Sequence, residues 1–357
     1  MLNEAFWHEF GSASLIQAID KALLTLPQVP QRLAVGLSGG ADSAMLALHA
    51  ALYARRKGIE LHCFHVHHGL QDTADAWQDH AHMLASLLQL PCHSYVVQVD
   101  LSNGDGIESA AREARYRALA LLAGQTRIQH ILLAHHRDDQ AETVLLRLLR
   151  GTGPSGMAAM APRSTRDGIT YLRPWLDMAR STILDQAHHF ADLSGWRPVQ
   201  DPTNADDSYT RAALRERLTP ALNERWPGWQ GNVLRHARQS AELNEVLDEV
   251  AHQDFSTLEP SSDARSFSLA AWRRLSHGRQ ALVLRYWLSQ LGQRMPTDAR
   301  LQDIMRQLRG LHALGHDRQM QVKHGDAWIR CLKGRVFIDS GDVEAGGGAE
   351  AEAGEKR

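Results

Sequence analysis

The first two hundred residues alternate between short apolar runs and longer amphipathic stretches. The predicted strands are 32–37, 59–66, 92–99 and 128–135, and the predicted helices are 41–57, 72–90, 107–124 and 138–151. Strands that alternate with helices in this way form a parallel sheet with helices on both faces. The pattern therefore predicts an α/β fold built on a doubly wound parallel sheet.

The pattern changes towards the C-terminus. Residues 151–171 are rich in Gly, Pro and Ser and predict a long loop, which is followed by a helix at 178–193. The pattern of apolar and polar residues at 220–311 predicts helices without intervening strands, and that at 318–338 predicts two or three short strands. We expect three parts: a first domain at 1–220, a mainly helical second domain with short C-terminal strands at 221–338, and a disordered acidic tail at 339–357.

Composition narrows the class of protein. The chain has 39 Lys and Arg against 41 Asp and Glu, so its overall charge gives no indication of nucleic-acid binding. Cys63, Cys92 and Cys331 are too few and too widely spaced for a disulfide framework, a zinc site or a cluster. No run approaches the roughly 18 apolar residues of a membrane span, and the N-terminus lacks a signal peptide's apolar stretch. The sequence predicts a soluble, cytoplasmic protein without a membrane segment.

A glycine-containing bend separates the first predicted strand from the first helix. It consists of Ser38, Gly39, Gly40, Ala41, Asp42 and Ser43. Glycines let the backbone approach a ligand, and the amides at a helix start bind anions such as phosphate. The lysine of the common phosphate loop is missing, and Asp42 would repel a bare phosphate, so we expect a divalent cation between them. The alternative is a simple turn in which Asp or Ser caps the helix.

Acidic residues open the predicted helix at 138–151. Asp139 and Glu142 are three residues apart and share one face of its first turn, where they could hold Mg²⁺ or orient an amine, and Asp138 can cap the helix. The alternative is a well-capped amphipathic helix without a ligand. Both this turn and the glycine bend follow predicted strands, and ligands of open α/β sheets bind at the carboxyl ends of strands.

Histidines and arginines suggest two other sites. Along an extended strand His65 and His67 would share one face and His62 and His68 the other, so the four cannot converge on a zinc ion. We interpret these four and His136 as packed or surface residues, and His135 as a site residue that contacts nucleotide or substrate. Arginines and tryptophans interleave at 223–239 and 271–294, which suits RNA phosphates and bases. The alternative for these helices is a core stripe, with Trp272, Leu275, Leu282 and Trp287 buried and the arginines in solvent.

These motifs resemble those of a known family. Residues 38–43 match the pyrophosphate loop of the N-type ATP pyrophosphatases, and 134–151 is similar to the H-H-x-D-D-Q-x-E-T signature of the tRNA(Ile)-lysidine synthetase family. Further family segments occur in the same order at 65–70, 108–116, 172–176 and 201–215. Gln71 stands where the family usually has arginine, and Ala212 where it usually has asparagine.

The resemblance implies a fold, a reaction and partners. It implies an adenine nucleotide α-hydrolase-like first domain and a second domain that binds tRNA. ATP would adenylate the C2 oxygen of the wobble cytidine in tRNA(Ile) with a CAU anticodon, and the ε-amine of L-lysine would displace AMP to give lysidine. ATP and Mg²⁺ are the implied cofactors, and a homodimer is left open.

The resemblance, together with the chemistry of the residues, also assigns a site. The expected catalytic residues are Asp42, Arg112, His135, Asp139, Glu142, Arg211 and Arg215. The nucleotide would bind at Ser38, Gly39, Gly40, Ala41, Asp42 and Ser43, and Mg²⁺ at Asp42 and Asp139.

Two alternatives remain from the sequence. A 2-thiocytidine thiolase has the same loop but needs paired cysteines for sulfur transfer, which the chain's spacing does not provide. A non-catalytic nucleotide sensor would bind ATP without releasing AMP.

Overall fold

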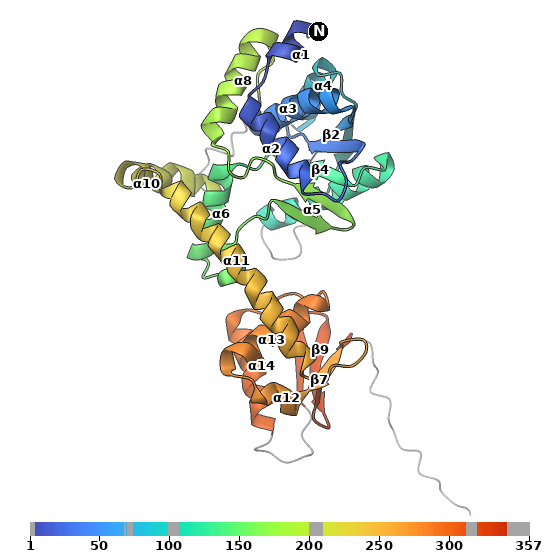
Figure 1. The fold of residues 1–357 in the computed structure, drawn as a ribbon, viewed down its shortest axis with the longest axis vertical. Coiled ribbons are helices and arrows are strands. Elements are labelled where there is room, and N and C mark those ends of the chain that lie inside the picture. The colour runs from blue at the N-terminus through green and yellow to red at the C-terminus, as the bar shows by residue number, and fades with distance from the viewer. Residues whose placement is uncertain are drawn as a thin grey trace, which may run out of the picture. The chain divides into compact units, whose positions relative to one another are not determined.

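The computed structural model describes residues 4–67, 69, 74–98, 107–199, 210–311 and 320–340 (Figure 1). The chain divides into two compact units, Met1–Ala241 and Glu242–Arg357. The first unit thus continues beyond residue 220, where we placed the end of the first domain. Gln71, the segment 201–209 and residues 341–357 of the predicted tail lie outside the described residues.

A six-stranded sheet forms the centre of the first unit. Its strands are β1 (Arg32–Gly36), β2 (Glu60–His67), β3 (Cys92–Val96), β4 (His130–Leu132), β5 (Arg163–Arg166) and β6 (Ile169–Leu172). Their order is β3-β2-β1-β4-β6-β5, and all neighbours run parallel except β5, which is antiparallel to β6. The chain winds outward from β1 to β3 and returns to the other side of β1 at β4. The carboxyl ends of β1 and β4 therefore flank the point where the winding reverses, which is the usual ligand position in such sheets.

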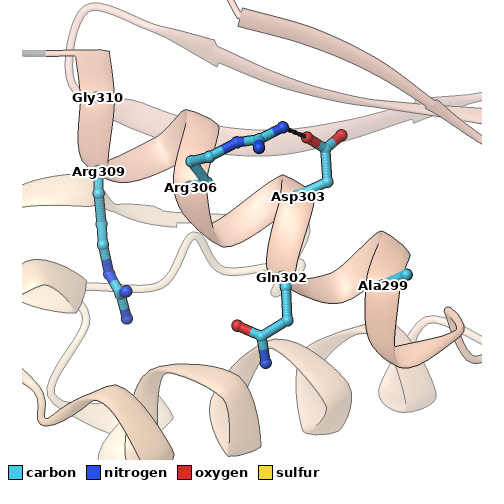
Figure 2. Close-up of a pocket in the computed structure, with 6 residues that line it drawn as sticks. All are labelled: Ala299, Gln302, Asp303, Arg306, Arg309 and Gly310. Carbon is cyan, nitrogen blue, oxygen red and sulfur yellow. Dashed lines mark hydrogen bonds and ion pairs between the residues drawn. The ribbon is translucent and has the colours of Figure 1, made fainter.

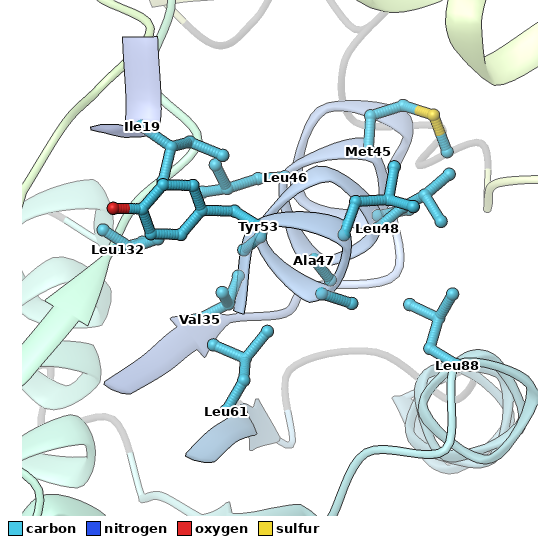
Figure 3. Packing of buried hydrophobic residues seen from close by; sticks show 14 of the residues in the cluster. Ile19, Val35, Met45, Leu46, Ala47, Leu48, Tyr53, Leu61, Leu88 and Leu132 are labelled. Carbon is cyan, nitrogen blue, oxygen red and sulfur yellow. The ribbon is translucent and has the colours of Figure 1, made fainter. Parts of the chain in front are cut away.

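Helices cover both faces of this sheet. On one face lie α2 (Ala13–Leu24), α3 (Ala41–Lys57), α4 (Ala74–Leu87) and α8 (Arg180–Ser194), and on the other lies α5 (Ile107–Thr126). Along β1, Leu33 and Val35 pack with α3, whereas Ala34 packs with α5, because successive side chains of a strand point to opposite faces. Figure 3 shows the α3 side of this packing, where Val35, Leu61 and Leu132 of three strands face Leu46 and Ala47. The predicted doubly wound sheet is confirmed.

The remaining elements of the first unit include short and irregular helices. These are α1 (Glu4–Glu9), α6 (Arg137–Leu149), α7 (Pro154–Met157), α9 (Thr210–Ala213), the π-helix η2 (Leu214–Leu218), α10 (Thr219–Arg225) and the start of α11 (Trp229–Ser256). Within this unit, Trp229 and Leu234 of α11 form a small core with Ala141 of α6. Residues 221–241 therefore help to support the helix that carries the predicted acids.

The prediction of a long loop at 151–171 is wrong. The segment contains α7 and most of a β5–β6 hairpin, whose strands are joined by Asp167 and Gly168. Both turn residues have positive φ, 52° and 75°, as a type I′ hairpin turn requires. An Asp-Gly pair is a strong signal for this turn, but the Gly, Pro and Ser content of the segment led us to predict a loop instead.

The second unit combines helices with an antiparallel sheet. Its elements after α11 are β7 (Ser266–Ser268), α12 (Leu269–Arg274), α13 (His277–Gln290), α14 (Asp298–Gly310), β8 (Met320–His324), β9 (Ala327–Leu332) and β10 (Arg335–Ser340). The sheet order is β7-β10-β9-β8. The short strands predicted near the end are confirmed, and β10 extends to Ser340. The region predicted as helices alone also contains β7, because this three-residue strand forms only by pairing with the distant β10.

The tryptophans of the second unit belong to its core. Trp272 and Trp287 are fully buried with Phe267, and their indole nitrogens donate hydrogen bonds to backbone carbonyls. The alternative of a core stripe is therefore correct for these two residues, which are not available to stack on bases. Separately, none of the helices in the described ranges is long and apolar enough to cross a membrane.

Candidate active site

Two serines hold the bend between β1 and α3 in shape. The Ser43 hydroxyl donates to the carbonyl of Gly40 at 3.1 Å and accepts from the backbone amide of Ser38 at 3.1 Å. The Ser38 and Ser43 hydroxyl oxygens are 2.9 Å apart, and the single proton of Ser43 is already used, so Ser38 donates to Ser43. Gly39 has a φ of 90°, which favours glycine at this point of the bend.

The start of α3 is left open by this arrangement. Gly40 is the N-cap, and within the described part of the chain no side chain caps the helix. The first amides of a helix have no partner inside the helix and carry the positive end of its dipole. Ala41, Asp42 and Ser43 thus present uncapped amides at the carboxyl end of β1, which is a favourable position for an anion.

His136, rather than Asp138, caps α6. The amide of Asp139 donates to His136 Nδ1 at 3.3 Å, and the amide of His136 donates to Asp139 Oδ2 at 3.1 Å. Asp138 lies inside the helix, and its Oδ2 accepts instead from the first amide of α8, that of Arg180, at 3.0 Å. The expectation that Asp138 caps its own helix is wrong, because a cap residue must have the extended backbone that His136 adopts.

His136 also joins the two predicted motifs. Its Nε2 lies 3.7 Å from Asp42 Oδ2 and 3.3 Å from Asp139 Oδ2. Since Nδ1 accepts the Asp139 amide, the neutral ring carries its proton on Nε2, facing both carboxylates. The glycine bend and the acidic helix, distant in sequence, therefore meet at one imidazole.

Burial and neighbouring charges have opposite effects on the pKa values of His136 and Asp42. Burial lowers the pKa of His136, but the neighbouring carboxylates of Asp42, Asp139 and Asp138 raise that pKa overall. Burial raises the pKa of Asp42, but His136 and Arg180 outweigh it, so the pKa of Asp42 lies below its usual value. Asp42 Oδ1 is buried without a hydrogen bond and lies 3.5 Å from Arg180 Nε. Asp42 is thus an ionised carboxylate whose Oδ1 accepts no hydrogen bond and has the Arg180 guanidinium as its cationic neighbour.

Glu142 is held by two of the predicted arginines. Arg215 contacts it twice, with Nε 2.5 Å from Oε1 and Nη2 2.9 Å from Oε2, and Arg211 Nη1 lies 3.4 Å from Oε2. Arg215 Nη2 is also 3.5 Å from Asp139 Oδ1. Burial lowers the pKa of Arg215, but the hydrogen bond and negative charge of Glu142 outweigh burial. The pKa of Arg215 therefore lies above its usual value. The arginines are four residues apart on α9 and η2, a spacing that brings both to the same carboxylate.

His135 and Arg112 belong to a neighbouring, cationic region. His135 Nδ1 is buried without a hydrogen bond, and burial, followed by the charges of Arg173, Arg112, Arg115 and Arg211, lowers its pKa to about 3. His135 is therefore neutral.

Arg112 lies over the ring of Tyr116, with its guanidinium carbon 5.3 Å from the ring centroid. Among the described residues, neither His135 nor Arg112 has an ion pair or hydrogen bond with Asp42, Asp139 or Glu142. The structure thus joins five of the seven predicted catalytic residues by direct or shared contacts.

Sequence reasoning missed two members of the site. His136 was treated as a packed or surface residue next to His135, and Arg180 was not considered. A signal existed for His136, since a polar residue three positions before Asp139 can form a capping box. No local signal relates Arg180 to Asp42. Ala212 is buried, so the departure from asparagine places a methyl group in a closed position.

A cavity of about 360 Å³ lies beside this site. Its charged lining residues are Arg137, Asp138, Glu142, Arg180, Arg215 and Glu216.

A larger cavity of about 670 Å³ lies along α14 in the second unit (Figure 2). Arg306 pairs there with Asp303 on the same helix, and Arg309 Nε donates to Gln280 Oε1 at 2.8 Å. Its charged groups thus have partners inside the unit, and we place the reaction at the strand ends of the first unit.

Comparison with known proteins first defines the class. Residues 13–222 match the PP-loop domain family, and 267–337 match the TilS substrate binding domain. A U34-tRNA thiolase from Methanococcus maripaludis has a similar fold, with a TM-score of 0.53 at 16% identity, covering 64% of this chain and 78% of that chain. This likeness shows the fold alone. The chain therefore contains a PP-loop domain of the ATP-binding class, on the fold described above.

Curated relatives then identify the family. The tRNA(Ile)-lysidine synthase of Bordetella bronchiseptica is 58% identical over 327 residues, covering 92% of this chain and 95% of that protein. That of Bordetella pertussis is 58% identical over 318 residues, covering 89% and 99%. The chain belongs to the tRNA(Ile)-lysidine synthase family, which removes the thiolase alternative.

Proposed function

We propose that the chain forms lysidine on tRNA(Ile) with a CAU anticodon. ATP adenylates the C2 oxygen of the wobble cytidine with release of pyrophosphate, and the ε-amine of L-lysine displaces AMP. The chain's membership of the family supports this reaction, and one structural observation carries the site: Asp42 of the glycine bend and Asp139 of the acidic helix meet at His136 Nε2. ATP phosphates would bind the uncapped amides at the start of α3.

Mg²⁺ fits the same place. Asp42 Oδ1 is a buried carboxylate oxygen without a hydrogen bond, and Asp139 reaches the same imidazole. In the described ranges, no group of three or more His, Cys, Asp or Glu could enclose a metal ion. Mg²⁺ needs no such cage, because it usually binds one or two carboxylates together with substrate phosphates. A bound Mg²⁺ would neutralise charge on the phosphates, and Asp42 and Asp139 would hold it.

Glu142 would bind the ε-ammonium of lysine, and Arg211 and Arg215 would favour its loss of a proton. The ε-ammonium of lysine has an unperturbed pKa of about 10.4, so it must lose a proton before it can attack. Glu142 already accepts two hydrogen bonds from Arg215, so the incoming ammonium would compete with Arg215 for that carboxylate. The positive charges of Arg211 and Arg215 disfavour the ammonium form and thereby help to expose the nucleophilic amine.

The cationic region would position the nucleotide base. Neutral His135 can donate or accept a hydrogen bond without adding charge, and Arg112 and Arg211 can neutralise phosphates or orient the cytidine. An anticodon loop allows its base to leave the stack at modest energy. We assign tRNA binding to 221–338, which includes the match to the TilS substrate binding domain, and catalysis to 1–220.

A transfer assay tests this function. The full chain is incubated with ATP, Mg²⁺, labelled L-lysine and a transcript of the CAU-anticodon tRNA(Ile), and the digested tRNA is analysed for nucleosides. We expect labelled lysidine and one AMP for each lysine transferred. ATP binding without AMP would support the nucleotide sensor instead. Cytoplasmic location and a homodimer remain part of the proposal, tested by cell fractionation and light scattering.

A further inference from the structure

The cavity beside the acidic end of α6 has an unusual balance of charge. Three arginines and three acids line it, from the first turn of α6, the start of α8 and the π-helix η2. Opposite charges in one small cavity suit a ligand that carries both signs. π-helices are rare and often occur at functional sites, and η2 contributes Arg215 and Glu216 to this wall.

Most of these charges already have partners. Glu142 is bound by Arg215, and Arg180 Nε lies 3.5 Å from Asp42 Oδ1. Asp138 accepts a hydrogen bond from the amide of Arg180. Asp138 Oδ2 also lies 3.8 Å from His136 Nδ1. Each of these four side chains therefore already has a partner inside the protein.

Arg137 and Glu216 are the exceptions among the charged lining residues. Nε of Arg137 is buried and has no hydrogen bond. In the part of the chain that the structure describes, the side chains of Arg137 and Glu216 form no ion pair with any other residue. The cavity thus has one unpaired cation and one unpaired anion on its wall.

We propose that Arg137 and Glu216 form the subsite for the α-carbon head group of the free amino acid substrate. Arg137 binds the α-carboxylate, for which a planar guanidinium is well suited, and Glu216 binds the α-ammonium. Glu142 lines the same cavity, so the side chain of the amino acid extends from this subsite towards Glu142 and Arg215. The inference rests on the proposed transfer of lysine and explains how the enzyme would select a whole amino acid rather than any primary amine.

Two analogues of lysine test each half of the subsite. Cadaverine lacks the α-carboxylate and 6-aminohexanoate lacks the α-amine, but both keep the terminal amine that attacks. Arg137→Gln should raise KM for lysine at least about tenfold, since a hydrogen bond to a charged group is lost, with little change in kcat. The preference for lysine over cadaverine should fall by the same factor, and that over 6-aminohexanoate should not. Glu216→Gln should give the opposite pattern.

Matched controls separate this effect from a general loss of charge. Arg56→Gln at the far end of α3 and Glu9→Gln at the end of α1 remove the same charges from exposed positions outside the cavity and should change neither preference. Thermal melting of all four variants is monitored by circular dichroism, and an unchanged melting temperature excludes misfolding.

Three outcomes would overturn the subsite. If the wild-type chain transfers no lysine, the proposed function fails and the subsite with it. If the wild type transfers lysine but both variants keep the wild-type preferences, only the subsite is wrong. If Arg137→Gln raises KM for tRNA and leaves the cadaverine preference unchanged, the arginine binds an RNA phosphate instead.

Discussion

Asp42 is the residue at which the start of α3 and the end of β4 become one site. Its carboxylate is partly buried, ionised and close to both His136 and Arg180. An acid beside uncapped helix amides weakens anion binding unless a cation accompanies the anion. A carboxylate at this position therefore makes chemical sense only if a metal ion and phosphates bind there together.

Replacing Asp42 tests that reason. Asp42→Asn keeps the size of the side chain and removes its charge, so AMP formation should fall at least about a hundredfold, as for loss of a key electrostatic group. Measured AMP release with tRNA and lysine present gives the rate, and Asp185→Asn on the exposed face of α8 is the control. A rate within a few-fold of wild type would remove Asp42 from the mechanism.

Glu142 should affect the second half-reaction more than the first. Glu142→Gln cannot hold the lysine ammonium by charge, and it also loosens Arg215. Lysine transfer should drop by at least about tenfold, while ATP affinity changes by less than about threefold. Single-turnover lysine transfer and equilibrium ATP binding measure the two effects, with Glu9→Gln at the exposed end of α1 as control. Equal losses in both would assign Glu142 to the nucleotide.

His49, which is not part of the candidate site, makes the free energy of unfolding depend on pH. Its ring is fully buried, with Nε2 accepting the amide of Ser12 at 3.1 Å and Nδ1 2.8 Å from the carbonyl of Met45. Burial, only partly opposed by its hydrogen bonds, lowers its pKa to about 4. In the unfolded chain the pKa of His49 is near 6.5, so the unfolded chain binds the proton more tightly than the folded protein. The free energy of unfolding is therefore undiminished above pH 6.5 and declines as the pH falls towards 4.

Urea unfolding at pH 7 and pH 5 measures this contribution. Between these values the wild type should lose about 2 kcal/mol of unfolding free energy through His49, at up to about 1.4 kcal/mol per pH unit. His49→Gln should remove that part of the pH dependence, and the exposed His188→Gln should retain it. If the loss is the same in His49→Gln as in the wild type, other groups cause it.

Among the elements, the β5–β6 hairpin depends on two residues with positive φ. Gly168→Ala puts a Cβ at a φ of 75° and should lower the unfolding free energy by about 1–2 kcal/mol. Gly124→Ala is a control of opposite sign, because Gly124 lies inside α5 with open space around a Cβ and should gain up to about 1 kcal/mol. Urea unfolding of both variants tests the turn, and a neutral Gly168→Ala would contradict it.

At the scale of the whole molecule, the packing of α11 determines where the chain can be cut. A chain that ends at Pro220 would expose Ala141 of α6, because Trp229 and Leu234 cover it. A chain that ends at Ala241 keeps this contact within the first unit. We expect residues 1–241 to bind ATP with near wild-type affinity once circular dichroism shows that they fold.

Salt dependence shows which unit binds RNA. Each neutralised phosphate contributes a slope of roughly −0.7 to −0.9 in a plot of log affinity against log salt. Residues 1–241 should bind tRNA more weakly and with a shallower slope than the full chain. Removal of 341–357, which is acidic on balance, should leave binding unchanged or slightly tighter. Equal slopes in filter binding for the full and shortened chains would place the RNA contacts in the first unit.

The sequence by itself determined the features that are local. Hydrophobic periodicity identified the first four strands and their helices, because a strand or helix must bury one face whatever it packs against. The glycine bend and the acids of α6 were recognised because their function requires particular residues within a few positions. Only the tertiary structure decided that Asp42, His136 and Arg180 meet, that Arg215 binds Glu142, and that β7 pairs with β10. Such contacts join segments distant in the chain, and local periodicity does not encode which distant surfaces come together.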